Sequence, residues 1–243
     1  MDDDDLFLPD HLSTLFKALT ENEDARLAYA RSTSIDSSKA TQTEFGAKFK
    51  PWRQLDTGFF HSQAALFARS LIAESARFDP DFEILEDMDF FVQCAQRTRF
   101  AYVERVTSVS YRDAGTSETG TQRDANRIND AISKLRTKWS VLELQLRSTP
   151  EFRLEHALWE IDHGSLAKAN ALLRSVSAER PDWPDAIAVA AMLDVRRNNL
   201  SALTRTLDIL NDREPWDLDL RTRLATLRAQ FAAQKKKWSN PEF

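Results

Sequence analysis

Residues 1–12 read MDDDDLFLPDHL, so four carboxylates stand in a row immediately before a short apolar stretch. Adjacent carboxylates repel one another, and a protein core cannot hold them unpaired. Solvent counter-ions or a divalent metal must therefore balance their charge. A second acidic and apolar stretch, residues 83–91, reads EILEDMDFF. These two stretches are the strongest candidates for a functional site.

The composition limits the class of protein. The chain has 243 residues, of which 42% are hydrophobic, enough for one sizeable core or two smaller ones. A net charge of −5 disfavours nucleic-acid binding, which requires a basic surface. The only cysteine is Cys94, so the chain cannot form an internal disulfide, which fits a reducing compartment. Cys94 belongs to an apolar helix, and we expect its side chain to be buried.

The same composition predicts where the chain is located. No run of 18 apolar residues occurs, so we expect no transmembrane segment. The acidic start does not have the pattern of a secretory signal. We therefore expect a cytoplasmic chain, which would work beside a membrane if its substrate were a lipid.

Residues 1–120 mix helix and strand signals. The spacing of apolar residues predicts helices over 12–19, 62–73 and 84–98. Apolar and β-branched residues predict strands over 26–35 and 100–111. The polar residues 37–54 are expected to form a long loop or a pair of short edge strands. Strands separated by helices imply an α/β layer structure.

The strand signal disappears after residue 120. Apolar residues recur every three or four positions over 122–147, which predicts one long amphipathic helix that ends before Pro150. They are Ile128, Ile132, Leu135, Trp139, Leu142 and Leu146. We therefore expect a connecting helix within residues 121–149, followed by an all-helical domain over residues 150–243.

From residue 150 the sequence repeats every 34 residues. Leu166 matches Leu200, and Pro181 matches Pro215. Small residues recur at the same interval, at positions 157, 191 and 225. A period of this length is typical of stacked helical hairpins, which need small residues where their helices cross closely.

This second half resembles tetratricopeptide repeats, whose units have small residues at their eighth and twentieth positions and proline at the thirty-second. In the first unit these positions hold Ala157, Ala169 and Pro181. In the second they hold Ala191, Leu203 and Pro215, and Leu203 departs from the pattern. Residues 218–236 would form a closing helix. Two interpretations remain open: an extension that stabilises the first domain, or a module that binds a protein partner through residues 150–236.

Residues 2–120 resemble the C-terminal part of a family 2 glycosyltransferase of the GT-A type. Such enzymes have an apolar strand followed by Asp-x-Asp-Asp, three further residues and Pro, and residues 2–9 here read DDDDLFLP. Residues 23–30 (EDARLAYA) resemble the helix and strand that follow. Residues 78–91, which include FDPDF and EDMDFF, resemble the family's turn and acid helix, and residues 101–117 resemble its closing strand and loop.

The resemblance implies a metal site at the Asp-x-Asp motif. The donor would be a nucleotide-diphospho-sugar, and its diphosphate leaves only when its charge is neutralised. A divalent cation held by oxygen ligands, Mn²⁺ or Mg²⁺, supplies that neutralisation. By resemblance, Asp4 would be the direct metal ligand, and Asp2 would contact the ribose or a water on the metal.

The resemblance also implies a catalytic base. In an inverting transfer, the acceptor hydroxyl loses its proton to a carboxylate as it attacks the sugar. By resemblance this base is Asp87, with Glu86 beside it shaping the site. Arg112, after the last strand, would help to hold the diphosphate. The acceptor, whether glycan, lipid or protein, has no readable motif.

Each assignment has a simpler alternative. Residues 2–5 could be a solvated terminus, and acidic residues near a helix start favour the helix dipole without any catalytic role. The first half would also lack the nucleotide-binding half of a GT-A domain. We therefore expect a glycosyltransferase fragment that is inactive alone, half of a complex, or a remnant domain beside a protein-interaction module.

Overall fold

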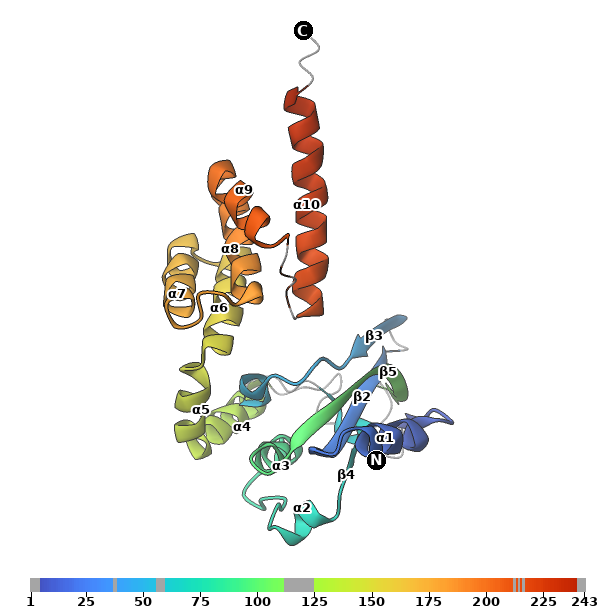
Figure 1. The fold of residues 1–243 in the computed structure, drawn as a ribbon. Coiled ribbons are helices and arrows are strands. Elements are labelled where there is room, and N and C mark those ends of the chain that lie inside the picture. Colours follow the sequence, from blue (N-terminus) through green and yellow to red (C-terminus); the bar gives the residue numbers. More distant parts are fainter. Residues whose placement is uncertain are drawn as a thin grey trace. The chain divides into compact units, whose positions relative to one another are not determined.

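The computed structural model describes residues 5–36, 39–55, 60–111, 125–211, 213, 215 and 217–239. The chain divides into two compact units, residues 1–144 and 145–243. In the described residues the first unit is mixed α/β and the second is all helical (Figure 1). None of the described helices combines the length and the apolar character that are needed to cross a membrane.

The first unit is built around strand β2 (Ala25–Asp36). Strand β5 (Arg99–Tyr111) runs parallel to β2, with Ala28 opposite Ala101. Strands β3 (Thr41–Phe45) and β4 (Ala65–Phe67) pair antiparallel with different parts of β2. Strand β1 (Leu6–Phe7) pairs antiparallel with the outer side of β5. The result is a small mixed sheet, and the strands expected over 26–35 and 100–111 are confirmed.

Both faces of β2 are covered, which explains why the apolar residues Leu27–Ala30 follow one another without interruption. Alternate residues Ala28 and Ala30 pack with Leu15 of helix α1 (His11–Glu21). The intervening residues Leu27 and Tyr29 pack with the aromatic side chains of helix α3 (Glu86–Ala95). Side chains alternate between the two faces of a strand, so one strand serves two helical layers. The helix expected over 12–19 is confirmed as α1.

The prediction of a helix over residues 62–73 is wrong. This segment forms a short 3₁₀ helix η2 (Ser62–Ala64), strand β4 and a short helix α2 (Ser70–Ala73). Residues 65–67 pair with Leu27–Tyr29 of β2, and this tertiary pairing outweighs the local helical spacing. In the polar region 37–54, the described residues form strand β3 and most of the 3₁₀ helix η1 (Pro51–Leu55).

The prediction of a single long helix over residues 122–147 is also wrong. The structure has two helices, α4 (Ala125–Lys138) and α5 (Ser140–Arg147), separated at Trp139. The Trp139 side chain bonds to helix α3, whereas Val141 and Leu144 of α5 are exposed. Helix α5 spans the boundary between the two units.

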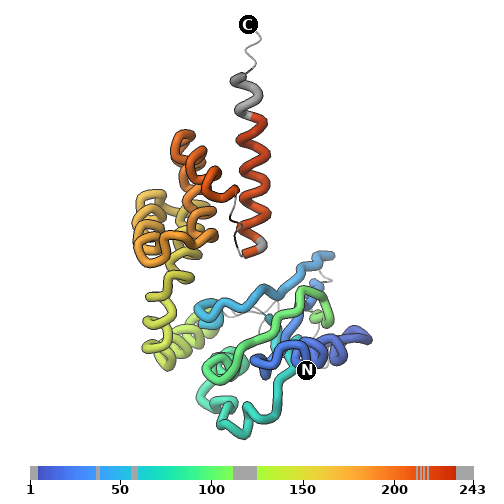
Figure 2. Tube along the Cα trace, in the orientation of Figure 1, coloured from blue at the N-terminus to red at the C-terminus, as the bar shows by residue number. Residues whose placement is uncertain are grey.

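The second unit contains helices α6 (Pro150–His163), α7 (Leu166–Glu179), α8 (Pro184–Arg196), α9 (Leu200–Ile209) and α10 (Leu218–Ser239) (Figure 2). Helices α6, α8 and α10 begin 34 residues apart, and so do α7 and α9. Ala157 and Ala191 are completely buried in one shared core, whereas Ala225 is exposed. The 34-residue period therefore corresponds to repeated helix starts.

Local sequence explains where these helices begin. Thr149, Ser165 and Asn199 accept hydrogen bonds from backbone N–H groups three residues later, which is the usual N-cap arrangement. Proline occupies the first turn of α6 and α8, where its missing N–H costs nothing.

Candidate functional site

The Glu86–Asp87 pair lies in the first turn of α3. Leu85, immediately before the helix, has φ 62° and ψ 22°, the left-handed conformation that non-glycine residues rarely adopt. The helix therefore begins at Glu86, two residues after the expected start at Ile84, and it ends at Ala95 rather than Thr98. Backbone strain of this kind concentrates at functional sites, where the surrounding structure maintains it.

Asp87 is partly buried and has defined partners. Its Oδ1 accepts a 2.7 Å hydrogen bond from the N–H of Met88, and its carboxylate accepts another from the Ser62 hydroxyl. Burial raises the pKa of the Asp87 carboxyl above its ordinary value, and the neighbouring Glu86 raises this pKa as well, while hydrogen bonds from Met88, from the Asp87 backbone and from Ser62 act against both. A carboxylate with a raised pKa accepts a proton more readily, as a general base must.

Glu86 is exposed at the same helix start, so its carboxylate is hydrated. It contributes negative charge next to Asp87. Both acids also lie at the positive end of the α3 dipole, which favours them regardless of any chemistry. Asp87 differs from Glu86 in its burial and in its bond to Ser62.

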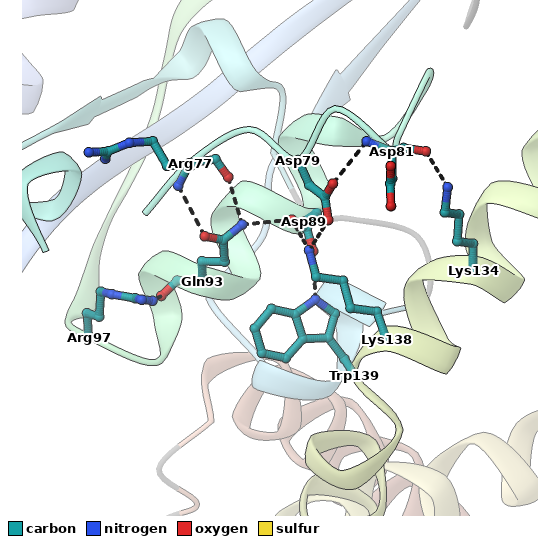
Figure 3. A network of polar contacts seen from close by, with 9 residues as sticks. All are labelled: Arg77, Asp79, Asp81, Asp89, Gln93, Arg97, Lys134, Lys138 and Trp139. Atoms are coloured by element: carbon teal, nitrogen blue, oxygen red, sulfur yellow. Dashed lines mark hydrogen bonds and ion pairs between the residues drawn. The ribbon is translucent and has the colours of Figure 1, made fainter. Parts of the chain in front are cut away.

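Asp89 is a functional candidate that sequence reasoning missed. Its side chain is completely buried. Its carboxylate accepts hydrogen bonds from Trp139 Nε1 at 2.8 Å, Lys138 Nζ at 2.9 Å and Gln93 Nε2 at 2.7 Å (Figure 3). Three donors satisfy a charge that would otherwise be costly to bury. Nothing in the local pattern around Asp89 indicates partners 49 and 50 residues away.

Lys138 connects two segments around the Glu86–Asp87 pair. Its Nζ lies 2.6 Å from the Asp79 carboxylate as well as 2.9 Å from that of Asp89 (Figure 3). Burial alone would lower the pKa of Lys138, but its hydrogen bonds to these two carboxylates outweigh burial and raise it. The bond from Lys138 likewise holds the pKa of Asp79 below its ordinary value.

The other predicted site residues, Asp2, Asp4 and Arg112, lie outside the described residues. Within the described ranges, no group of three or more His, Cys, Asp or Glu side chains could hold a metal ion. Glu86 and Asp87 therefore form no such metal-binding cluster with described neighbours.

The second unit exposes an aromatic and imidazole stripe on α6. Phe152, His156, Trp159 and His163 recur at helical spacing, and the Trp159 and His163 rings stack with centroids 5.6 Å apart. Trp159 is 54% exposed, whereas Leu193, which stands 34 residues later on α8, is 3% exposed. This position of the repeat is thus covered in the second hairpin and uncovered in the first.

No protein-family model matches this chain, and no curated protein matches it either.

Proposed function

We propose that this chain is part of a glycosyltransferase of the GT-A type, which transfers a sugar from a nucleotide-diphospho-sugar to an acceptor hydroxyl. The single observation that carries the proposal is Asp87: a partly buried carboxylate with a raised pKa, bonded by Ser62, at a strained helix start. The order of the acidic stretches along the chain agrees with it. Since Cys94 is the only cysteine, we place the reaction in a reducing cytoplasm.

In this proposal Asp87 accepts the proton of the acceptor hydroxyl as the hydroxyl oxygen attacks the anomeric carbon. The bond from that carbon to the diphosphate breaks on the opposite face, so the configuration inverts. Glu86 adds an exposed negative charge beside Asp87. A divalent cation held by Asp4, when bound, would neutralise the leaving diphosphate, and Asp2 and Arg112 would contact the donor.

Strand β5 contacts an element next to each of the two acidic stretches. Ser62, which bonds to Asp87, belongs to η2, and η2 contacts both β2 and β5. Strand β1, which follows the acidic run, pairs with β5 at Val109 and Ser108. Strand β1 and the 3₁₀ helix η2 therefore both contact β5.

The test compares Asp87→Asn with Glu86→Gln, which neutralises an adjacent but exposed carboxylate. Release of nucleoside diphosphate is measured with a panel of nucleotide sugars and Mn²⁺, on this chain and on the longest open reading frame that contains it. We expect Asp87→Asn to lower turnover about a hundred- to ten-thousand-fold, and Glu86→Gln to lower it much less. Full turnover in Asp87→Asn, or no turnover with any donor in the extended chain, would contradict the proposal.

The pH dependence of turnover gives a second criterion. Asp87 accepts a proton only when it is ionised, so kcat/KM should fall as the pH drops through its raised pKa. If kcat/KM did not change over that pH range, the catalytic base would have to be a group other than Asp87.

A second candidate function, partner binding by the helical unit, is favoured by the exposed stripe on α6. In helical repeats, terminal faces normally become polar because nothing covers them, yet this one presents Trp159. We expect Trp159→Ser to abolish capture of a specific partner by the full chain. Val195→Ser, which removes an exposed apolar side chain from α8, is the matched control. Equal capture of the partner by both variants would argue against a binding role for the exposed stripe on α6.

A further inference from the structure

Helix α4 lies along the segment that leads into the candidate site. Three of its basic residues face this segment: Arg127 pairs with Glu83 at 3.3 Å, Lys134 donates to the backbone carbonyl of Asp81, and Lys138 bonds to Asp79 and Asp89. Lys134 and Lys138 also lie 5.2 and 5.3 Å from the centroid of the buried Phe82 ring. These contacts attach residues 79–89 to one face of one helix.

Lys138 and Trp139 hold this segment on both sides of Glu86 and Asp87. Asp79 precedes the pair and Asp89 follows it, and Lys138 bonds to both carboxylates. Trp139 adds a bond to Asp89 from the position where α4 ends. The Asp89 N–H in turn bonds to the carbonyl of Leu85, the residue in the left-handed conformation. The strained turn and the first turn of α3 are therefore tied to the end of α4.

We propose that Trp139 is a positioning residue for Asp87: through Asp89, it and Lys138 hold the first turn of α3 so that the Asp87 carboxylate stays beside Ser62. The proposal rests on the catalytic role proposed for Asp87. Its physical basis is that α3 cannot move away from α4 without leaving the buried Asp89 charge short of donors. Asp87, two residues earlier on the same turn, must follow Asp89.

The test is Trp139→Phe, which removes the indole donor, keeps an aromatic ring and changes no charge. The carboxyl carbon of Asp87 is followed by NMR as the pH is varied. In the wild-type chain we expect its titration midpoint to lie above the ordinary aspartate value, because burial raises the pKa of this carboxyl. In Trp139→Phe we expect the midpoint to fall toward that value, because the released carboxylate gains water. In the transferase assay we expect kcat to fall while KM for the nucleotide sugar stays unchanged.

The matched control is Trp183→Phe. Trp183 Nε1 donates a 2.7 Å hydrogen bond to the buried carboxylate of Asp185 in the second unit, so the control loses the same type of bond. A merely structural role for Trp139 predicts a similar loss of stability in both variants and an unchanged Asp87 midpoint in both. That result would overturn the proposal.

Two further outcomes are decisive. A shifted midpoint in a chain without transferase activity would reject the proposed function and keep the positioning role, since the NMR signal does not depend on turnover. If Trp139→Phe did not fold, hydrogen exchange in the wild-type chain would decide. The Trp139 indole N–H and the Asp89 amide should then share one opening free energy, and independent opening would reject the positioning role.

Discussion

The carboxylate of Glu160 lies directly over Gly164, so that a Cβ added to Gly164 would be 2.1 Å from Glu160 Oε2. Glu160 is buried, and the same Oε2 accepts a 2.6 Å hydrogen bond from the N–H of Ser165, the N-cap of α7. The close approach of the Glu160 side chain therefore leaves no room for a side chain at position 164.

Gly164→Ala should destabilise the second unit by about 1–3 kcal/mol, because the displaced Glu160 carboxylate loses its bond to Ser165 while it stays in the core. Urea unfolding measures the change. The matched experiment repeats the substitution in a Glu160→Ala background, where the clash is absent and the added cost should nearly vanish. An equal cost in both backgrounds would contradict the explanation.

Asp185 joins α8 to the start of α10. Its carboxylate accepts hydrogen bonds from Trp183 Nε1 at 2.7 Å and from the N–H of Asp217 at 2.9 Å. Asp185→Ala leaves two donors without this partner and should cost about 2–3 kcal/mol of unfolding free energy. Asp219→Ala, at an exposed position in the first turn of α10, is the control and should change stability little.

His11 should make the first unit less stable in mild acid. Its ring is buried, with Nδ1 2.9 Å from Thr107 Oγ1, and burial lowers its pKa below the ordinary 6.5 despite opposing contributions from Thr107 and Asp10. A lowered pKa means that the unfolded chain binds the proton more readily. The stabilisation is thus present above pH 6.5 and lost as the pH falls toward the folded pKa.

Urea unfolding at several pH values between 7.5 and 5 tests this. We expect His11→Asn to reduce the pH dependence of the unfolding free energy, whereas His163→Gln, at an exposed ring, should leave it intact. An unaltered pH dependence in His11→Asn would assign the effect to other groups.

Cys94 should be unreactive in the folded chain. It is completely buried among aromatic side chains, as expected from its place in an apolar helix, and burial raises the pKa of its thiol to about 11. At pH 8 this pKa alone slows reaction with a thiol reagent by roughly two orders of magnitude relative to an ordinary thiol. Equal rates before and after unfolding in urea would contradict the burial of Cys94; Cys94→Ser provides the blank.

Several elements could be predicted because their patterns are strong and local. Strand β2 has apolar residues on both faces over Leu27–Ala30, and α1 has the spacing of a half-buried helix. The helix starts of the second unit follow from prolines, capping side chains and a period of 34 residues. Whether each of these segments forms a helix or a strand does not depend on residues far away in the sequence.

Other elements could not be predicted, because distant partners decide them. Residues 65–67 have helical spacing but are a strand, since β2 offers an edge at Leu27–Tyr29. Residues 122–147 have continuous amphipathic spacing, yet the helix is interrupted at Trp139, whose side chain bonds to Asp89. Helix α3 begins late because Leu85 adopts a left-handed conformation.

The sequence by itself determined which residues could do chemistry: Glu86 and Asp87 stand out as an acidic pair before an apolar helix. Only the tertiary structure decided that Asp87 is the one with a raised pKa, because the burial that raises it comes from other chain segments that fold over this carboxylate. It also brought Lys138 and Trp139 to Asp89. The physical reason is that periodicity reports a residue's own helix or strand, whereas desolvation and pairing depend on what packs against it.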